Sequence, residues 1–413
     1  MNRFFVIDLN IGMEKKMKKT LLVSLVLIMA ASVSFRLKNL TGQEAGGGNG
    51  TPEAAVVTPE REAYDTQMTA YKENLKKLRS LKEEYQTATP ETRDQIQSQF
   101  APLVQETGRL QKELIPAAIA AYQASNGSDA EIFQFLMVML EWSVIKTENY
   151  EMAHDIAVVL LPSGKIPDEY AYLYAYGAYA SFNVMELEDA DRFYTMTKEK
   201  GGLESLRKQD PRGEMQIPAI LAKFLPEYKE LWAQEKEIRA REAQGDNLPR
   251  VLLRTTKGDI VLELFLHEAP ESVGNFMTLV SQKYYNGVPF HRVLPHFMAQ
   301  GGDPTGTGAG GPGYCIADEC RKPGARNHFR GSLSMAKTSQ PNSGGSQFFL
   351  TFVPTEFLNG QHTVFGRIVE GMDVLSEIQR IDPEEKNLPA PDKIVEAVIL
   401  RGEPTPFKKL PEK

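Results

Sequence analysis

Four stretches in the C-terminal part of the chain contain the polar and aromatic side chains that could do chemistry. They cover residues 290–303, 331–336, 342–349 and 357–366. Their members include a guanidinium, an amide and an imidazole, which can donate hydrogen bonds, together with aromatic rings and a thioether. Taken singly, each has an ordinary structural explanation, because a lone arginine is usually solvated or ion-paired and a Phe-Met pair usually lies in a core.

A fifth stretch, from Gly306 to Gly311, satisfies the G-x-G-x-x-G pattern of dinucleotide-binding loops. Such a site needs a strand before the pattern and a helix that opens at its end, facing the phosphates. Here Gly302-Asp303-Pro304 precedes the glycines and Pro312-Gly313 follows them, a turn-like context with neither the strand nor the helix that such a site needs. We interpret this segment as a surface loop.

The four stretches read FHRVLPHFMAQGGD, GSLSMA, NSGGSQFF and FLNGQHTVFG. In this order and spacing they resemble the cyclophilins, the family of peptidyl-prolyl cis-trans isomerases. The resemblance covers about residues 249–403, with several long motifs in register. It implies an eight-stranded antiparallel barrel capped by two helices, and isomerase activity that uses no metal or cofactor.

The implied reaction breaks no bond. Rotation about an Xaa-Pro bond faces a barrier of about 18–20 kcal/mol from amide resonance and takes tens to hundreds of seconds unaided. The enzyme needs only to bind the twisted amide more tightly than either planar isomer. Twisting localises a lone pair on the prolyl nitrogen and changes the charge on the carbonyl oxygen. A fixed cation with several donors therefore stabilises the twisted state selectively.

By resemblance, Arg292 is this cation, Gln300 orients the substrate backbone and supports the arginine, and His362 lies on the pocket rim. These three residues form the predicted catalytic set. The predicted substrate-binding residues form the apolar slot for the proline ring and the segments beside it, and they are Phe297, Met298, Ala336, Lys337, Thr338, Gln347, Phe349, Phe357 and Leu358.

Two departures from the family pattern change the expected specificity. After Ala336 the usual Asn-Ala is replaced by Lys337-Thr338, with one extra residue before Pro341, in the segment whose backbone pairs with bound peptide in the family. Phe357 stands where many members carry tryptophan. The resemblance implies that isomerase activity is kept, while cyclosporin, which uses the indole N–H, binds more weakly.

Cys315 and Cys320 lie in the glycine-rich region of the same domain. Export would permit a disulfide between them, whereas a metal site there lacks the usual ligand spacing. Two reduced thiols are the simplest expectation. The histidines that gain no functional support from the resemblance are His267, His291, His296 and His328.

The elements around these residues predict a mainly β domain. Residues 251–264 have the pattern of two strands around a turn at Lys257-Gly258-Asp259. Short strand-like runs then alternate with glycine-rich loops, and only residues 269–284 and 372–379 have helical patterns. We therefore expect an antiparallel β-barrel or sandwich with one or two helices over residues 249–403, followed by a tail over residues 404–413.

Residues 60–245 predict an all-helical domain. Apolar positions recur every three or four residues from Met68 to Tyr85 and from Ile96 to Leu114, which is typical of two amphipathic helices in an antiparallel hairpin. Pro102 lies inside the second stripe, where we expect it to kink or break the helix. The acidic run over residues 227–242 is interpreted as a solvated helix that leads out of the domain.

Residues 129–200 align with themselves without gaps at an offset of 37. Trp142 falls on Tyr179, and Ala153 falls on Ala190. A period of this length, with small residues at the packing points, resembles a degenerate tetratricopeptide (TPR) repeat. Two interpretations stay open: a groove for peptides or partner proteins, and a compact bundle whose tyrosines simply pack.

The first 36 residues carry six basic and two acidic side chains, with four lysines among residues 15–19 directly before an apolar run. This arrangement is typical of a secretory signal peptide. We expect cleavage near Ser34, and an uncleaved membrane anchor or a buried helix are the alternatives. Both export interpretations place the rest of the chain in the periplasm or cell envelope.

Residues 37–59 contain a glycine-rich run and are expected to form a flexible linker. The formal net charge of −7 comes from the acidic helical region, and it argues against a nucleic-acid-binding protein. The expected partners are proline-containing peptides and unfolded or exported protein clients, with a further protein partner for the helical domain. The alternative function is a non-catalytic proline-peptide-binding chaperone or scaffold, and the intact polar set favours the enzyme.

Overall fold

The computed structural model describes residues 58–412, except 212, 214, 246 and 387. The predicted signal or anchor and the linker up to residue 57 lie outside the described residues. Within the described part of the chain, no helix is both long and apolar enough to cross a membrane. The chain divides into two compact units, one that ends at Val138 and one that begins at Met139.

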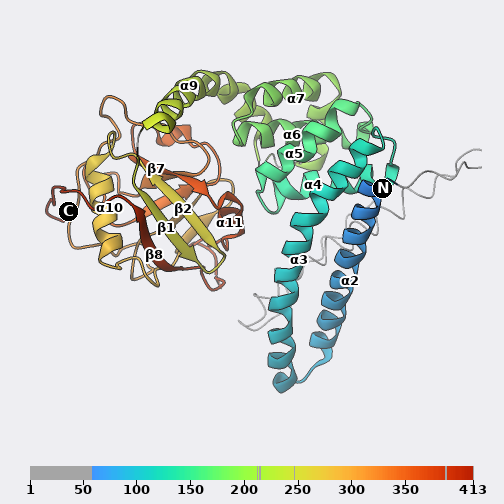
Figure 1. The fold of residues 1–413 in the computed structure, drawn as a ribbon, viewed down its shortest axis with the longest axis horizontal. Coiled ribbons are helices and arrows are strands. Elements are labelled where there is room, and N and C mark those ends of the chain that lie inside the picture. The colour runs from blue at the N-terminus through green and yellow to red at the C-terminus, as the bar shows by residue number, and fades with distance from the viewer. Residues whose placement is uncertain (1–57, 212, 214, 246, 387, 413) are drawn as a thin grey trace, which may run out of the picture. The chain divides into compact units, whose positions relative to one another are not determined.

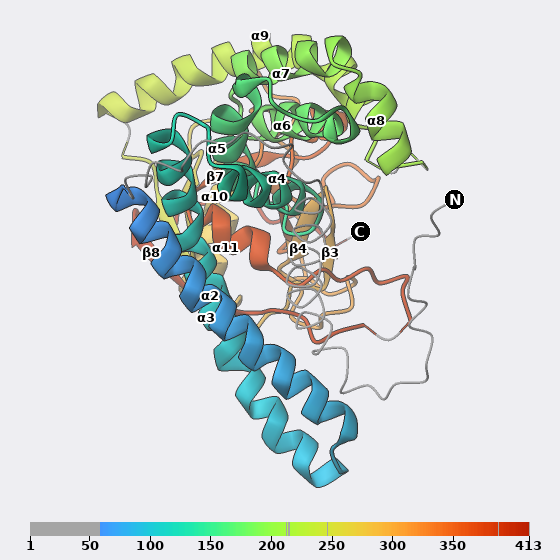
Figure 2. The same ribbon diagram turned by 90° about the vertical axis from the view of Figure 1, so that its right-hand side faces the viewer.

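The first unit is built around an antiparallel pair of helices, α2 (Pro59–Thr87) and α3 (Pro90–Ala124) (Figure 2). The Thr58 side chain caps α2 by accepting a hydrogen bond from the Arg61 N–H. Between the helices, the Asn74 amide donates to the Thr107 hydroxyl at 2.7 Å. The predicted apolar stripes are buried in this contact, so the predicted hairpin is confirmed.

Helix α3 continues through Pro102, so of the two expected outcomes, a kink or a break, the break does not occur. Pro102 lies on the exposed side of the helix, where a carbonyl that loses its partner can bond to water. Phe100 and Leu110, on either side of it in the sequence, are both buried. Packing of the stripe thus outweighs a local cost of about 3 kcal/mol for proline.

Four helices follow at the predicted repeat spacing. The pair α4 (Ala130–Ile145) and α5 (Tyr150–Leu160) corresponds to the pair α6 (Tyr172–Asn183) and α7 (Leu187–Glu199). Glu148 and Met185 occupy the same repeat position, and both have positive φ angles, 51° and 66°. The repeated helix pair is therefore present, and its resemblance to tetratricopeptide repeats stays a prediction.

The second unit also contains an eight-stranded antiparallel sheet in the order β3-β4-β6-β5-β7-β2-β1-β8. Figure 1 labels β7, β2, β1 and β8 of this sheet. The strands are β1 (Arg250–Thr255), β2 (Asp259–Leu264), β3 (Arg292–Leu294), β4 (Met298–Gly301), β5 (Ser332–Met335), β6 (Phe348–Thr351), β7 (Val364–Glu370) and β8 (Ile394–Arg401). Residues 287–290, before β3, share backbone hydrogen bonds with residues 392–394 at the start of β8. These bonds bring the two edges of the sheet together, as a barrel requires.

Two helices accompany the sheet, α10 (Pro270–Ser281) and α11 (Met372–Glu377), on opposite sides of the strands (Figure 1). Phe276 of α10 enters the core, where its ring centre lies 5.5 Å from those of Phe348 and Phe365. The predicted fold class, a helical region followed by a barrel with two helices, is confirmed. The tail packs on the barrel, since Leu410 and Cys315 exchange backbone hydrogen bonds.

Helices α8 (Gly202–Gln209) and α9 (Ile217–Gly245) complete the helical region. The interpretation of the acidic run on α9 as solvated holds for Glu227, Glu230 and Glu237, which are exposed, but it was wrong for Glu235 and Glu242. Glu235 and Glu242 are buried against the barrel, where the Arg326 guanidinium binds them at 2.7 and 2.6 Å. A second arginine, Arg367, bridges Glu242 and Glu263. The chain passes from helix to strand near residue 249 as expected, but α9 and the barrel pack as one unit.

A histidine is completely buried in the barrel. The His328 ring nitrogens lie 2.9 Å from the Asn359 side-chain oxygen and 3.0 Å from the Ser334 hydroxyl. The ring also stacks on Phe349, with centroids 6.0 Å apart. Burial lowers the pKa of His328 to about 4, so the imidazole is neutral at pH 7.

We predict that His328 makes the protein less stable in mild acid. In the unfolded chain its imidazole takes a proton near pH 6.5, whereas in the folded protein it does so only near pH 4. The stabilising contribution is complete above the unfolded pKa and is lost as the pH falls through this window, by on the order of 2–3 kcal/mol. Urea unfolding of the protein and of His328→Gln at pH 7.5 and pH 4.5 measures this. The difference in the free energy of unfolding between the unchanged protein and His328→Gln should be smaller at pH 4.5 than at pH 7.5. The same difference at both pH values would contradict the prediction.

Arg326→Met should destabilise the second unit strongly. The variant removes the most buried cation beside Glu235 and Glu242 and leaves them with only Arg239 and Arg367, which costs up to about 3–5 kcal/mol. Arg254→Met is the matched control, because Arg254 pairs with Glu396 at the surface with 52% of its side chain exposed. Such surface pairs contribute only about 0–1 kcal/mol. Thermal unfolding compares the variants, and similar melting temperatures for both would show the prediction to be wrong.

Candidate active site

The register of the sheet places three predicted site residues in a row. Arg292 on β3 pairs with Gln300 on β4, and Gln300 pairs with Phe349 on β6. Directly opposed residues on adjacent strands point to the same face of a sheet. The predicted cation, amide and aromatic ring are therefore neighbours.

The Arg292 guanidinium lies beside apolar side chains of its own hairpin. Its central carbon Cζ is 5.7 Å from the ring centre of Phe297, and Nη1 is 4.0 Å from the Met298 sulfur. Met298 is buried, whereas Arg292 and Phe297 are half-buried. The positive charge is thus held next to an apolar floor while part of the side chain remains exposed.

Gln300 is held in place by a chain of amide hydrogen bonds. Its Nε2 donates to Gln347 Oε1 at 2.9 Å. Gln347 Nε2 donates in turn to the carbonyl oxygens of Gly308 and Gly310, both at 2.9 Å. These bonds connect β4 to the glycine-rich loop and leave the Gln300 carbonyl oxygen as an acceptor for a guanidinium or a peptide N–H.

Aromatic side chains bound the apolar slot. Phe349 is 4% exposed, and its ring meets that of His362 edge-on with centroids 5.6 Å apart. Phe357 is 54% exposed, and its ring centre lies 5.6 Å from that of Phe297. Leu358, half-buried, ends the short 3-10 turn Glu356–Leu358. Together they offer the kind of apolar surface that a proline ring requires.

His362 adds a polar group to the rim of the slot. Its Nδ1 lies 3.0 Å from the Met335 carbonyl oxygen, to which it donates in the neutral tautomer. Burial lowers the pKa of His362, so the neutral form is the one present at pH 7. Nε2 is then an acceptor, and the histidine contributes a hydrogen-bonding group rather than a charge.

The predicted flanking segment after β5 is tied to its own chain. The Ala336 N–H donates to the Gln347 carbonyl oxygen at 3.0 Å. Lys337 Nζ lies 3.5 Å from an Asp318 carboxylate oxygen, and the exposed Thr338 hydroxyl donates to Ser343. The side chains of Lys337 and Thr338 therefore contact neighbouring loops, and their role toward substrate stays a prediction.

Sequence reasoning missed a group of residues that holds the β3–β4 hairpin from the helical region. The His296 backbone N–H, in the turn of this hairpin, donates to Glu148 Oε2 at 2.7 Å, and Tyr150 Oη lies 2.8 Å from His296 Nδ1. Glu148 also pairs with Arg380 at 2.8 Å. Burial lowers the pKa of His296. No motif marks these residues, because the contact joins positions 148 residues apart.

The glycine pattern from Gly306 to Gly311 is a loop, as expected. Its backbone N–H groups are directed at a carboxylate of the chain itself: Thr305, Gly308 and Gly310 donate to Asp303. Burial opposes ionisation of Asp303, but these hydrogen bonds prevail and lower its pKa to about 2. The amides are therefore already used by an internal anion.

Cys315 and Cys320 are buried free thiols and are not joined to each other. Burial raises the pKa of Cys320, which favours its protonated form. In the described part of the chain, no group of three or more His, Cys, Asp or Glu side chains could hold a metal ion.

Known proteins with this barrel are similar to the chain over its C-terminal part. Residues 250–399 match the family described as cyclophilin type peptidyl-prolyl cis-trans isomerase/CLD. A peptidyl-prolyl cis-trans isomerase of Helicobacter pylori is 51% identical over 132 residues, which cover 32% of this chain and 80% of the relative. Peptidyl-prolyl cis-trans isomerase-like 1 of Gibberella zeae is 43% identical over 157 residues, which cover 37% of this chain and 96% of the relative.

A crystal structure of a Cryptosporidium parvum cyclophilin type peptidyl-prolyl cis-trans isomerase is 34% identical, with 38% of this chain and 99% of that chain covered and a TM-score of 0.35. Sequence identities above 40% that extend over most of the length of a relative are decisive for family membership. The chain therefore belongs to the cyclophilin-type peptidyl-prolyl cis-trans isomerases.

Proposed function

We propose that the barrel isomerises Xaa-Pro bonds in exported protein chains, and that Arg292 stabilises the twisted amide. The observation that carries this proposal is the row of Arg292, Gln300 and Phe349 across three strands. The row sets a cation and an amide next to an apolar slot. A proline ring in that slot would present its amide bond to the guanidinium.

The guanidinium would act only on the transition state. The rotational barrier of about 18–20 kcal/mol arises from amide resonance. As the amide twists, the prolyl nitrogen regains a lone pair that can accept an N–H from the planar donor fork of Arg292. Neither planar isomer offers this lone pair, so the hydrogen bond lowers the barrier rather than tightening ground-state binding.

The other site residues would position the substrate. Phe349 and Met298 form the buried floor on which the proline ring rests. Gln300 offers its carbonyl oxygen to the peptide backbone or to the arginine, and neutral His362 offers Nε2 at the rim. The proline ring is then held while the chain on the other side of the bond rotates.

We also propose that the reaction takes place outside the cytoplasm. The support is the sequence of residues 14–36, in which lysines precede an apolar run and small residues follow it. The clients would be exported proteins whose folding waits for proline isomerisation, a step of tens of seconds or longer when unaided. The helical region would then contact the client or a protein partner.

In the full chain, Arg292→Ala should lower kcat/KM for a short Ala-Pro peptide by about 10²-fold or more, because one preorganised donor is removed from a developing charge. Arg292→Lys should restore only part of the activity, because an ammonium group lacks the planar fork. Exchange NMR measures the isomerisation rate. Arg254→Ala, at an exposed ion pair on β1, is the matched control and should keep full activity.

The competing function, a module that only holds proline-containing chains, makes a different prediction for the same experiment. It would bind the peptide without any gain in the isomerisation rate over buffer. Full activity in Arg292→Ala would leave an isomerase but would reject the mechanism proposed for it.

Cleavage of the signal predicts a mature chain that begins close to residue 35. N-terminal sequencing of the protein from exported and membrane fractions measures this. A chain that retains residues 14–34 in the membrane fraction would support the anchor instead. Recovery from the cytoplasm alone, with these residues intact, would overturn the proposed export.

A further inference from the structure

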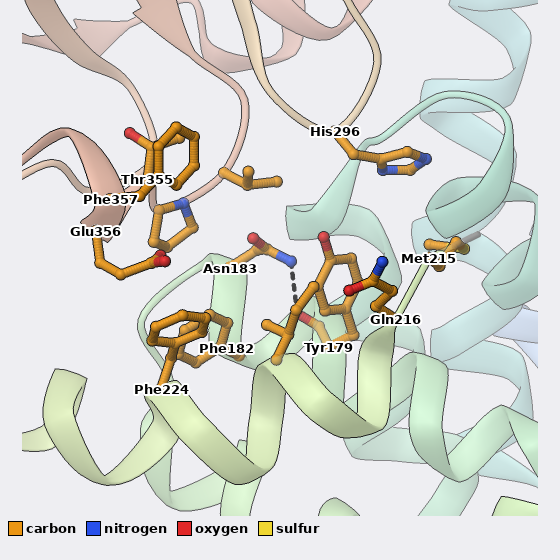
Figure 3. A pocket seen from close by; sticks show the side chains of 13 residues that line it. Tyr179, Phe182, Asn183, Met215, Gln216, Phe224, His296, Thr355, Glu356 and Phe357 are labelled. Carbon is orange, nitrogen blue, oxygen red and sulfur yellow. Dashed lines mark hydrogen bonds between the residues drawn. The ribbon is translucent and has the colours of Figure 1, made fainter. Parts of the chain in front are cut away.

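A cavity of about 240 Å³ lies within the second unit, next to the candidate active site (Figure 3). One wall comes from the helical region, with Phe182 and Asn183 on α6 and Phe224 on α9. The other wall comes from the barrel, with His296 in the β3–β4 turn and residues 353–357 after β6. None of the residue positions predicted for the site pointed to this cavity except Phe357.

Phe357 connects the cavity to the proline slot. This residue lines the cavity, and its ring centre is 5.6 Å from that of Phe297. Phe297 in turn lies beside the Arg292 guanidinium. Because 54% of Phe357 is exposed, a peptide can cross its ring from one site to the other. When the slot binds a proline of a client, the neighbouring residues of the client would therefore lie at the opening of the cavity.

Two buried polar atoms of the cavity wall lack a hydrogen-bond partner in the described part of the chain: Asn183 Oδ1 and Thr355 Oγ1. Both residues are 0% exposed. Asn183 Nδ2 is already bonded to the Tyr179 carbonyl oxygen at 2.8 Å, and Figure 3 shows the Asn183 amide reaching into the space between the walls. Unpaired buried polar atoms are unfavourable. Because neither atom has accessible surface, they make the wall beside the cavity partly polar without bonding to a ligand in it.

The chemistry of the other wall residues indicates which type of side chain the cavity could bind. Phe182, Ile220 and Phe224 offer aromatic and aliphatic surface. Glu356, also in the wall, would disfavour an acidic side chain. The cavity is smaller than the roughly 300–1,000 Å³ of pockets for drug-sized ligands, so it suits one large side chain rather than a free small molecule.

The walls are joined by buried contacts, so the cavity is formed before any ligand arrives. The ring centre of Tyr228 lies 5.4 Å from that of Phe182 and 5.7 Å from that of Phe329. The Tyr228 hydroxyl donates to the His328 carbonyl oxygen at 2.9 Å. At the other end, Tyr150 contacts His296. A preformed cavity avoids the entropy cost of assembling its walls on binding.

We propose that this cavity is a second subsite for the client chain. It takes an aromatic or large aliphatic side chain that lies within a few residues of the isomerised proline. The inference rests on the proposed isomerase function and names its substrate class: Xaa-Pro segments with a large apolar residue close to the proline.

The test uses the full chain and short peptides around one Ala-Pro bond. A phenylalanine is moved through three positions on each side of this pair, and the reference peptide carries serine at all of them. We expect one register to raise kcat/KM about fivefold or more over the reference, from burial of the ring. Equal kcat/KM for all peptides would overturn the inference and leave the isomerase proposal intact. If no peptide is isomerised, the proposed function fails, and NMR titration still shows whether affinity depends on the phenylalanine.

Ile220→Trp should fill the cavity and reduce the phenylalanine preference to below about twofold, with unchanged activity on the serine reference. Ala222→Trp is the matched control, because it places the same ring on an exposed position of α9 outside the cavity lining. Phe224→Ala removes part of the wall and should also weaken the preference, which keeps the test decisive if Ile220→Trp does not fold. A preference that persists in both variants would overturn the inference.

Discussion

The second unit depends on charges that are buried between its helices and its barrel. The Arg326 guanidinium is 2% exposed and can stay there only while Glu235 and Glu242 remain beside it. These two glutamates are two turns apart on α9 and therefore lie on one face of the helix. Separation of α9 from the barrel would take Arg326 away from both glutamates and Arg367 away from Glu242. The helix is thus fixed to the barrel by electrostatics that water cannot screen.

A second group of contacts joins the helical region to the hairpin of the candidate active site. His296 has a φ of 53° in the turn that joins β3 to β4, and its N–H and imidazole are held by Glu148 and Tyr150. Arg292 and Phe297 belong to the same hairpin. The helical region therefore supports the hairpin that carries the cation, although the family fold does not require it: the match with the Gibberella zeae relative covers 96% of that protein and 37% of this chain.

Much of the barrel and its site could be predicted because the information is local. The turn at Gly258, the strands on both sides of it and the motif that carries Arg292 and Gln300 are each continuous in the sequence. What could not be predicted depends on partners that are distant in the chain. An acidic helix has the same pattern whether water or arginines face it, and Glu235 meets an arginine 91 residues away. Pro102 does not end its helix for the related reason that tertiary packing can override a local preference.

The proline slot and the cavity beside Phe357 must both bind the part of the client chain that does not rotate during isomerisation. Arg292 would bond a lone pair that exists only in the twisted amide, so its contribution falls on kcat. A side chain in a preformed cavity makes the same contacts before and during rotation only if it lies on the part of the chain that stays fixed. On the rotating part, those contacts would have to break in the transition state and would oppose the reaction. Because the slot holds the proline ring, the fixed part comprises the proline and the residues after it. The cavity can thus assist isomerisation only for a large side chain that follows the proline, and its contribution falls on KM.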